Sequence, residues 1–216
     1  MTDARGNKGS EFDEGDARTR VIGAATELLD EMPLSKLSMR RVAERAGVSL
    51  GTVTYHYRSR HALLEDCLEP FNDLLIRALE RSRTALSRGT PFAGHCVDLV
   101  RELYPELLAI RTLVRLRLIR TLEDDTHPHH HDRVLRHPFL QLGGRSVDGW
   151  LAPRSRMVLA ALAAVVARFV SFPAHELLEL TGRDTLAQAE EDVQETLVFM
   201  TQRLLQPERT PSEAPR

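Results

Sequence analysis

The polar residues best placed to do chemistry lie in two neighbouring segments, each compatible with a short helix. Arg40 and Arg41 stand at the start of the first segment, where a guanidinium could bind a phosphate. The second segment presents hydroxyls, a phenol and an imidazole on its outward face, which comprises Leu50, Gly51, Thr52, Thr54, Tyr55 and His56. Such a surface can enter a major groove of DNA and form hydrogen bonds with base edges.

Two helices joined by a tight turn are needed to hold that surface in place. Ser38 and Ser49 are good N-caps for the two helices, and Gly47 between them can adopt a left-handed turn. The apolar side chains that would form a shared core are Val42, Ala43, Ala46, Val48 and Val53. The spacing therefore predicts a helix-turn-helix over residues 39–57.

Basic residues concentrate around this region, although the whole chain has a net charge of -2. Residues 18–63 contain eight basic and four acidic residues, a net charge of +4, whereas residues 1–17 and 64–216 each carry -3. This distribution favours a nucleic-acid-binding segment attached to a body with another role. Charge alone leaves a chance fluctuation open as the alternative.

The composition of the 216 residues, 42% hydrophobic and 5% aromatic, is typical of a mostly helical globular protein. Cys67 and Cys96 form no CxxC pair, and the polar N-terminus lacks the apolar stretch of a signal peptide. The longest apolar run, Met157–Ala167, is too short to span a bilayer. We therefore expect a cytoplasmic protein with no disulfide, no cofactor and no membrane contact.

Hydrophobic periodicity predicts an all-α chain and no strands. A long helix from Arg60 to about Ser87 would be kinked or split at Pro70, and Pro91 and Pro105 would punctuate the next helices. Two further helices are expected near the C-terminus: Arg154–Leu180, interrupted near Pro173, and Asp184–Leu205.

Residues 18–64 resemble the N-terminal domain of TetR-family transcriptional regulators. The matching pieces are Ile22–Leu29 (IGAATELL), Leu37–Gly47 (LSMRRVAERAG), Val48–Thr52 (VSLGT) and Tyr55–Leu64 (YHYRSRHALL). The resemblance implies a three-helix DNA-binding domain followed by a larger helical domain for ligand binding and dimerisation. The expected divisions are a disordered lead-in (1–16), the helix-turn-helix domain (17–63), the helical domain (64–206) and a disordered tail (207–216).

The resemblance also assigns roles to individual residues. Ser38, Arg40 and Arg60 would contact phosphate. The residues expected to face bases or the DNA backbone are Ser49, Leu50, Gly51, Thr52 and Thr54, and those expected to brace the recognition helix or reach phosphate are Tyr55, His56 and Tyr57. Thr54 stands where the family often has tyrosine and His61 where it usually has an acid, so the operator sequence stays open.

The two C-terminal helices have the pattern of a dimer interface. Met157–Ala167 is apolar on every side and rich in alanine, which allows a partner helix to approach closely. The last helix repeats apolar residues along one narrow seam: Val193, Leu197, Met200 and Leu204. Two such helices from each subunit would make a four-helix interface, the dimer mode that the resemblance implies, and packing inside one subunit is the alternative.

The effector pocket is weakly specified by the sequence. Large or polar residues on otherwise apolar helices could line it, namely Tyr104, Arg117, Trp150, Phe169 and Phe172, although each could equally belong to the core or the surface. The histidines between His127 and His137 could bind a metal, but they lack a cysteine or a helical pair, so no metal site is expected. No catalytic motif such as GxSxG or HExxH is present, so the chain is not expected to be an enzyme.

These patterns and the resemblance together predict a homodimeric, ligand-responsive DNA-binding regulator, a repressor released from a palindromic operator by a small molecule. Activation instead of repression stays open, since it depends on where the operator lies relative to a promoter. Its partners would be double-stranded DNA, a small-molecule effector and a second copy of the chain. Two alternatives stay open: a ligand-independent architectural DNA-binding protein, and a metal-responsive regulator that uses the loop from His127 to His137.

Overall fold

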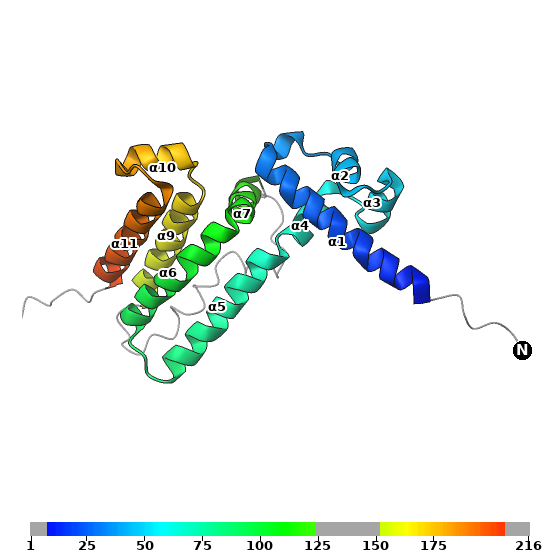
Figure 1. Ribbon diagram of the computed structural model, residues 1–216. Coiled ribbons are helices and arrows are strands. Elements are labelled where there is room, and N and C mark those ends of the chain that lie inside the picture. The colour runs from blue at the N-terminus through cyan, green and yellow to red at the C-terminus, as the bar shows by residue number, and fades with distance from the viewer. Residues whose placement is uncertain (1–7, 124–151, 206–216) are drawn as a thin grey trace, which may run out of the picture. The chain divides into compact units, whose positions relative to one another are not determined.

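The computed structural model describes residues 8–123 and 152–205, which are helical apart from short connections (Figure 1). The chain divides into two compact units, an N-terminal unit of residues 1–71 and a C-terminal unit of residues 72–216. Within the described ranges no residue is in a strand, and the predicted all-α fold class is confirmed.

The N-terminal unit is built on one long helix, α1 (Lys8–Glu31). The three short helices α2 (Met39–Ala46), α3 (Leu50–His56) and α4 (Arg60–Cys67) each contact α1. Burial of one side of each helix is what holds these short segments, because helices of seven or eight residues are marginal by themselves. The residues that form this core include Val21, Ala25, Leu28, Val42, Ala43, Val53, Leu63 and Leu64.

The N-caps predicted at Ser38 and Ser49 are confirmed, and Ser59 caps α4 in the same way. The Ser38 Oγ accepts a hydrogen bond from the Arg41 amide at 3.3 Å, Ser49 accepts one from Thr52 at 3.0 Å, and Ser59 accepts one from Ala62 at 3.1 Å. Gly47 ends α2 with a φ of 65°, the left-handed conformation that a side chain disfavours.

Two boundaries differ from the sequence-based expectation. Residues 1–16 were expected to be disordered, but α1 begins at Lys8, in a stretch that contains no proline and has four acids near the positive end of the helix dipole. The compact unit also extends beyond the expected boundary at residues 63 and 64. It reaches Phe71 because α4 and the residue after it bury Leu64, Cys67 and Leu68.

The C-terminal unit packs three helices against one another: α6 (Phe92–Ala109), α9 (Ala152–Val170) and α11 (Leu186–Leu205). Figure 1 shows these three running side by side. Helix α7 (Arg111–Glu123) contacts α6 and α9, and α10 (Ala174–Thr181) contacts α11. Helix α5 (Glu69–Ser87) begins where the two units divide.

The prolines behave differently from one another. Leu68 separates α4 from α5, and Pro70 lies in the first turn of α5, where its missing N–H is not needed. Pro173 is the N-cap of α10, so both predicted interruptions are confirmed. Pro105 lies inside α6 and does not end it, contrary to expectation. Pro105 leaves the carbonyl of Arg101 without its helical donor, and the Gln194 side chain of α11 donates to that carbonyl at 2.8 Å.

The expected dimer helices are only partly buried in the single chain. In α9, Met157 is 76% exposed, so the run that we expected to be buried on every side has an open face within one subunit. In α11, Val193 and Leu197 of the predicted seam are buried within the chain, whereas Leu204 is exposed. Phe199, which the seam did not include, is 55% exposed.

Cys67 and Cys96 are buried free thiols, and burial raises the pKa of Cys67 to about 11 and that of Cys96 to about 12. Within the described residues, no single helix is long and apolar enough to cross a membrane. Only Met157–Val170 and Ala174–Thr181 together, bent by 109°, reach that length and apolarity.

Candidate nucleic-acid interface

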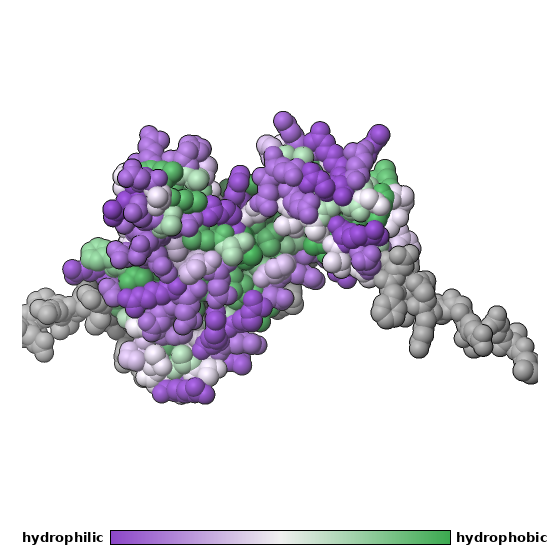
Figure 2. Space-filling model, in the orientation of Figure 1, coloured by the Kyte–Doolittle hydropathy of each residue, from purple (hydrophilic) through white to green (hydrophobic). Residues whose placement is uncertain are grey.

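Helix α3 presents an exposed face from a firmly anchored position. Val53 is completely buried and fixes the inner side of the helix. On the outer side, Leu50 is 45% exposed and Tyr55 is 73% exposed, and Thr54 and Gly51 are also exposed. Figure 2 shows hydrophobic surface over the outer end of α3, beside predominantly polar surface. A short exposed helix face of this kind fits the width of a major groove.

The threonine hydroxyls of α3 are hydrogen-bonded within the helix and to its N-cap, Ser49. Ser49 Oγ and Thr52 Oγ1 lie 2.9 Å apart, and Thr54 Oγ1 donates to the carbonyls of Leu50 and Gly51 at 3.0 and 3.1 Å. The Thr52 and Thr54 hydroxyl oxygens keep acceptor capacity, which can receive a base amino group, and the Thr54 methyl can contact a thymine methyl.

The three aromatic residues at the end of α3 have distinct environments. Tyr57 is only 3% exposed and its hydroxyl donates to Asp66 Oδ2 at 2.9 Å, so its expected bracing role agrees with the geometry. Tyr55 is 73% exposed, so of the two expected roles a contact with phosphate fits its position better than bracing, and this contact stays a prediction. His56 is half-buried, with ring centroids 5.3 Å from Tyr55 and 6.5 Å from Tyr57.

The two residues expected to meet phosphate at the start of α2 are both exposed. Ser38 uses its side chain to cap α2, and the Arg40 Nε donates to Glu44 Oε1 at 3.1 Å. Both members of the Arg40–Glu44 pair are mostly exposed, so the pair is weak and Arg40 can leave it for a phosphate.

Other arginines of the N-terminal unit already serve the fold. Arg60 donates to the carbonyls of Leu34 and Leu37 at 3.2 and 3.3 Å, which fixes the connection between α1 and α2. Arg41 likewise donates to the carbonyl of Lys36 at 3.0 Å, and Arg45 pairs with Glu27 and Glu31. Arg60 as a phosphate contact stays a prediction, with its guanidinium committed elsewhere in this structure.

Lys36 and Arg58 are two of the eight basic residues in the segment 18–63, and the sequence alone assigns neither of them a role. Both are exposed, and neither has an ion pair or a side-chain hydrogen bond within the described residues. Lys36 lies just before α2 and Arg58 just after α3, so they flank the helix-turn-helix on either side in sequence. Their position in the connections at its two ends was the signal that could have identified them.

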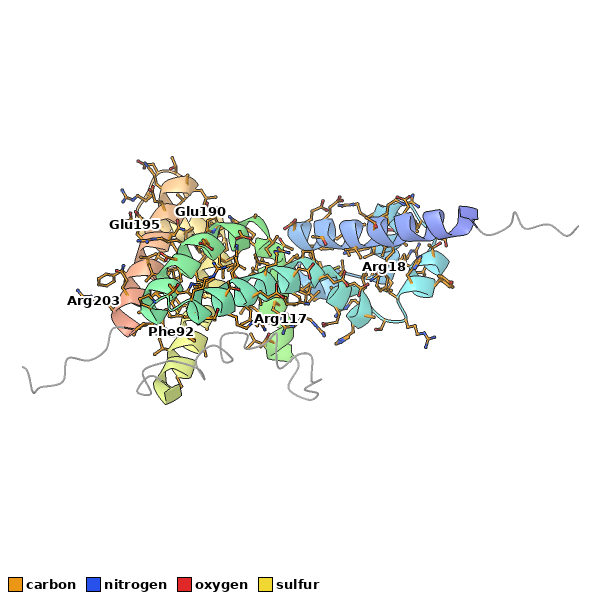
Figure 3. All side chains as sticks on the ribbon, turned by 90° about the horizontal axis from the view of Figure 1, so that it is seen from below. Arg18, Phe92, Arg117, Glu190, Glu195 and Arg203 are labelled. Atoms are coloured by element: carbon orange, nitrogen blue, oxygen red, sulfur yellow. The ribbon has the colours of Figure 1, made fainter. Side chains whose placement is uncertain are left out.

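In the C-terminal unit, Tyr104 is the candidate pocket residue with the clearest polar signature. It is 2% exposed, and its hydroxyl has no hydrogen-bond partner in the described structure. Burial, followed by the nearby Glu190 carboxylate, raises the pKa of Tyr104 to about 12. Glu190 itself pairs with Arg111 at 2.7 Å, and Figure 3 labels Glu190 on α11.

The other candidate pocket residues are not gathered around Tyr104 by any recorded contact. Phe169 and Phe172 contact each other with centroids 5.6 Å apart, and the Arg168 guanidinium lies 3.8 Å from the centre of the Phe172 ring. Arg117 is half-buried on α7, and Trp150 lies outside the described residues.

A groove with a volume of about 490 Å³ opens along α5. Its described lining residues are Arg77, Glu80, Arg81, Thr84, Ala85 and Arg88, none of which we predicted from the sequence. Arg81 in this groove also pairs with Glu102 and Glu106 of α6. The groove is open and strongly charged, unlike an enclosed apolar effector pocket.

The alternative metal site, the loop from His127 to His137, lies outside the described residues. Among the residues that the structure describes, no three potential metal ligands come together.

Comparison with known proteins places the N-terminal unit in a family. Residues 21–67 match the family of bacterial regulatory proteins, tetR family. The chain is 30% identical over 97 residues to the HTH-type transcriptional regulator UidR of Escherichia coli K12, covering 45% of this chain and 47% of that protein. It is 29% identical over 76 residues to the regulator BetI of Ectopseudomonas mendocina, covering 35% and 39%. The chain thus spans less than half the length of the curated relatives it matches.

Solved structures extend the likeness to the whole fold. The multidrug binding protein EbrR, complexed with imidazole, matches with a TM-score of 0.54 at 20% identity, over 91% of this chain and 98% of that one. NalD of Pseudomonas aeruginosa, the secondary repressor of the MexAB-OprM multidrug efflux pump, matches with 0.55 at 20% identity, over 87% and 96%. At this identity the likeness shows the fold. The matched family consists of regulatory proteins, which agrees with the prediction that the chain is not an enzyme.

Proposed function

Because residues 21–67 match the tetR family of bacterial regulatory proteins, we propose that the chain is a cytoplasmic homodimer that binds a palindromic operator and is released by a small molecule. The observation that carries the DNA-binding part is the face of α3. A seven-residue helix is capped by Ser49, anchored through Val53, and exposes Leu50, Gly51, Thr54 and Tyr55.

Three cations are the best phosphate contacts. Lys36 and Arg58 have no partner among the described residues, and Arg40 has only its exposed pair with Glu44. Each phosphate neutralised adds roughly one unit to the slope of the logarithm of affinity against that of salt. Arg41, Arg45 and Arg60 would have to give up contacts within the fold first.

Dimerisation would cover the apolar surface that the single chain leaves open on α9 and α11. Met157, Phe199 and Leu204 are large hydrophobic residues with about half or more of their surface exposed, and Figure 2 shows hydrophobic surface near the end of α11. Such a contact between identical surfaces gives two-fold symmetry. Two recognition helices related by that symmetry would meet half-sites roughly 34–36 Å apart.

A small-molecule effector in the C-terminal unit is supported by its buried polar atoms. Asn72 Oδ1 and the Tyr104 hydroxyl are buried and lack partners in the described structure, a costly arrangement that a ligand can relieve. EbrR is a multidrug binding protein and NalD is a repressor, which supports a repressor with a small-molecule effector here. A tenfold release from DNA needs about 1.4 kcal/mol of coupling between effector and operator binding.

The test is selection of random DNA duplexes by the purified full chain, followed by fluorescence anisotropy on the enriched sequence at two salt concentrations. Enrichment of a palindrome with steep salt dependence supports the proposal. Arg40→Ala should weaken binding to all duplexes alike, whereas Thr52→Ala should reduce the preference for the enriched one. No enriched sequence, or binding that both variants leave unchanged, would contradict it.

The ligand-independent alternative is tested on the same duplex. Compounds are screened for saturable release of the labelled DNA from the protein. A compound that lowers operator affinity at saturation excludes a purely architectural role, because it must bind the free and DNA-bound conformations with different affinity.

A further inference from the structure

Three helices of the N-terminal unit are joined by one small cluster of polar side chains: Arg18 from α1, Tyr57 from the end of α3, and Asp66 from α4. We propose that Tyr57 is a positioning residue for sequence recognition, and that its hydroxyl, held by Asp66 and Arg18, sets the direction in which α3 presents its exposed face. This inference rests on the proposed DNA-binding function.

The cluster is tightly connected. The Tyr57 hydroxyl donates to Asp66 Oδ2 at 2.9 Å, and the same oxygen accepts from Arg18 Nη2 at 2.6 Å and Nε at 3.2 Å. Arg18 Nε also approaches the Tyr57 oxygen at 3.4 Å. Figure 3 marks Arg18 on α1, beside the cyan helices of this unit. Each of the three side chains therefore contacts the other two.

Helix α3 needs such an anchor because it is short. Seven residues make two turns, so its direction is set by what its ends contact. Val53 fixes the middle of the helix by burial, and Ser49 caps its start. Tyr57 is the C-cap in an extended conformation, with φ of -129° and ψ of 105°, and its side chain is the only cap of α3 that reaches another helix.

The hydroxyl contributes more than packing. A phenylalanine would fill the same buried volume, but it could not bond to Asp66. Burial raises the pKa of Tyr57 to about 12, so the phenol stays protonated and donates at neutral pH. The chain returns from Tyr57 to α4 within three residues, so the bond to Asp66 closes a short loop that fixes the end of α3 against α4.

The experiment compares Tyr57→Phe with the wild-type full chain. Affinity is measured by anisotropy for the selected duplex and for a scrambled duplex, and thermal stability is measured in parallel. We expect the ratio of the two affinities to fall about tenfold, the effect of losing one good base contact, while affinity for the scrambled duplex and the salt dependence stay unchanged.

Ser59→Ala is the matched control. It removes the N-cap of α4 next to Tyr57, so it lowers stability by a similar mechanism without touching the cluster. A fall in the affinity ratio no larger than that of Ser59→Ala would overturn the proposal. An equal fall for both duplexes, with a shallower salt slope, would also overturn it, because Tyr57 would then be a phosphate contact.

Arg18→Met is the second variant and keeps the proposal testable if Tyr57→Phe does not fold. It leaves the bond between Tyr57 and Asp66 intact but frees Asp66 from α1, and we expect a smaller fall in the same ratio. An unchanged ratio in both variants overturns the positioning role while leaving DNA binding in place. Failure of the wild-type chain to enrich any duplex would instead overturn the proposed function itself.

Discussion

The two units of this chain differ in how completely their buried polar atoms are hydrogen-bonded. In the described part of the N-terminal unit, no buried side-chain nitrogen or oxygen lacks a partner, and Arg18, Tyr57 and Asp66 join three of its helices. In the C-terminal unit, Asn72 Oδ1 and the Tyr104 hydroxyl are buried without one. Each such atom costs about 1–3 kcal/mol of stability.

The difference is local and follows from where each unit would bind its partner. The C-terminal unit satisfies other buried polar groups, since Ser82 donates to the Ala78 carbonyl at 2.8 Å and His95 lies 2.8 Å from the same Ser82 oxygen. DNA would bind on the surface of α3, so the residues beneath that surface can be fully bonded beforehand. The proposed small-molecule effector would bind inside a helical unit, and there the protein alone leaves the Asn72 Oδ1 and the Tyr104 hydroxyl unpaired.

The largest expected effect separates the folding of the two units. Leu63→Ala in α4 and Leu197→Ala in α11 truncate leucines that are both completely buried, and each should cost about 2–5 kcal/mol of unfolding free energy. Leu63→Ala should abolish DNA binding but keep the dimer, whereas Leu197→Ala should weaken the dimer first. Urea unfolding monitored by circular dichroism measures the free energy of unfolding. Fluorescence anisotropy measures DNA binding, and size-exclusion chromatography measures dimerisation.

A single cooperative domain would behave otherwise. If Leu63→Ala and Leu197→Ala shifted one common unfolding transition, and each removed both DNA binding and dimerisation, the two units would not be independent. The two units would then share one cooperatively folding core, and the difference in their hydrogen bonding would be a difference within that core.

The same substitution in both units should change stability in opposite directions. Tyr57→Phe removes a hydroxyl bonded to Asp66 and should lower the free energy of unfolding by about 1 kcal/mol. Tyr104→Phe removes a buried hydroxyl without a partner and should raise it by about 1 kcal/mol. Chemical denaturation of the two variants and the wild type, without effector, makes the measurement.

A destabilising Tyr104→Phe would contradict the difference between the two units, because it would mean that the Tyr104 hydroxyl has a hydrogen-bond partner in solution. If Tyr104→Phe stabilises the protein and also lowers its affinity for an effector identified by release from DNA, the unpaired hydroxyl belongs to the effector site. Phe169→Leu is a control in the same unit that changes apolar packing without altering any hydrogen bond.

The salt dependence of DNA binding tests which cations of the N-terminal unit are available. Lys36→Gln and Arg58→Gln should each reduce the slope of log affinity against log salt by about one unit. Arg45→Gln is the matched control, since Arg45 is held by Glu27 and Glu31, and it should leave the slope unchanged. Equal slopes for all three variants would show that the pairing in the structure does not predict phosphate contact.

The parts of the fold that the sequence predicts are those set by neighbouring residues, such as helix caps and helix breaks. Caps such as Ser38 and Ser49, and helix breaks such as Pro70 and Pro173, act over a few residues, so their positions follow from sequence. The helix-turn-helix and the helical class are therefore predictable. The dimer seam stays a prediction, because the period of α11 does not reveal whether an apolar face meets its own chain or a second copy, and Val193 and Leu197 are buried within the chain.

The remainder depends on partners that are distant in sequence. Arg18 and Asp66 are 48 residues apart, and no local sequence pattern predicts that both contact Tyr57. The exposures of Tyr55 and Tyr57 differ because Tyr57 lies beyond the helix in an extended conformation, where helical spacing no longer applies. Likewise, α6 continues through Pro105 with its freed carbonyl bonded by a residue from α11.

The smallest expected effect separates stability from DNA affinity within α3. A methyl group at Gly51 would meet only Ser49 Oγ, at the ordinary contact distance of 3.4 Å, so Gly51→Ala introduces no strain into the free protein. Alanine restricts the unfolded chain and favours the helix, and stability should rise by about 0.5 kcal/mol. Gly51 is exposed on the face proposed to meet DNA, where the added methyl would hold the backbone away from the groove, so operator affinity should fall several-fold. A melting temperature that rises while affinity falls would show that the surface of α3 is shaped for its partner, because folding alone favours the substitution; a rise in both would remove Gly51 from the interface.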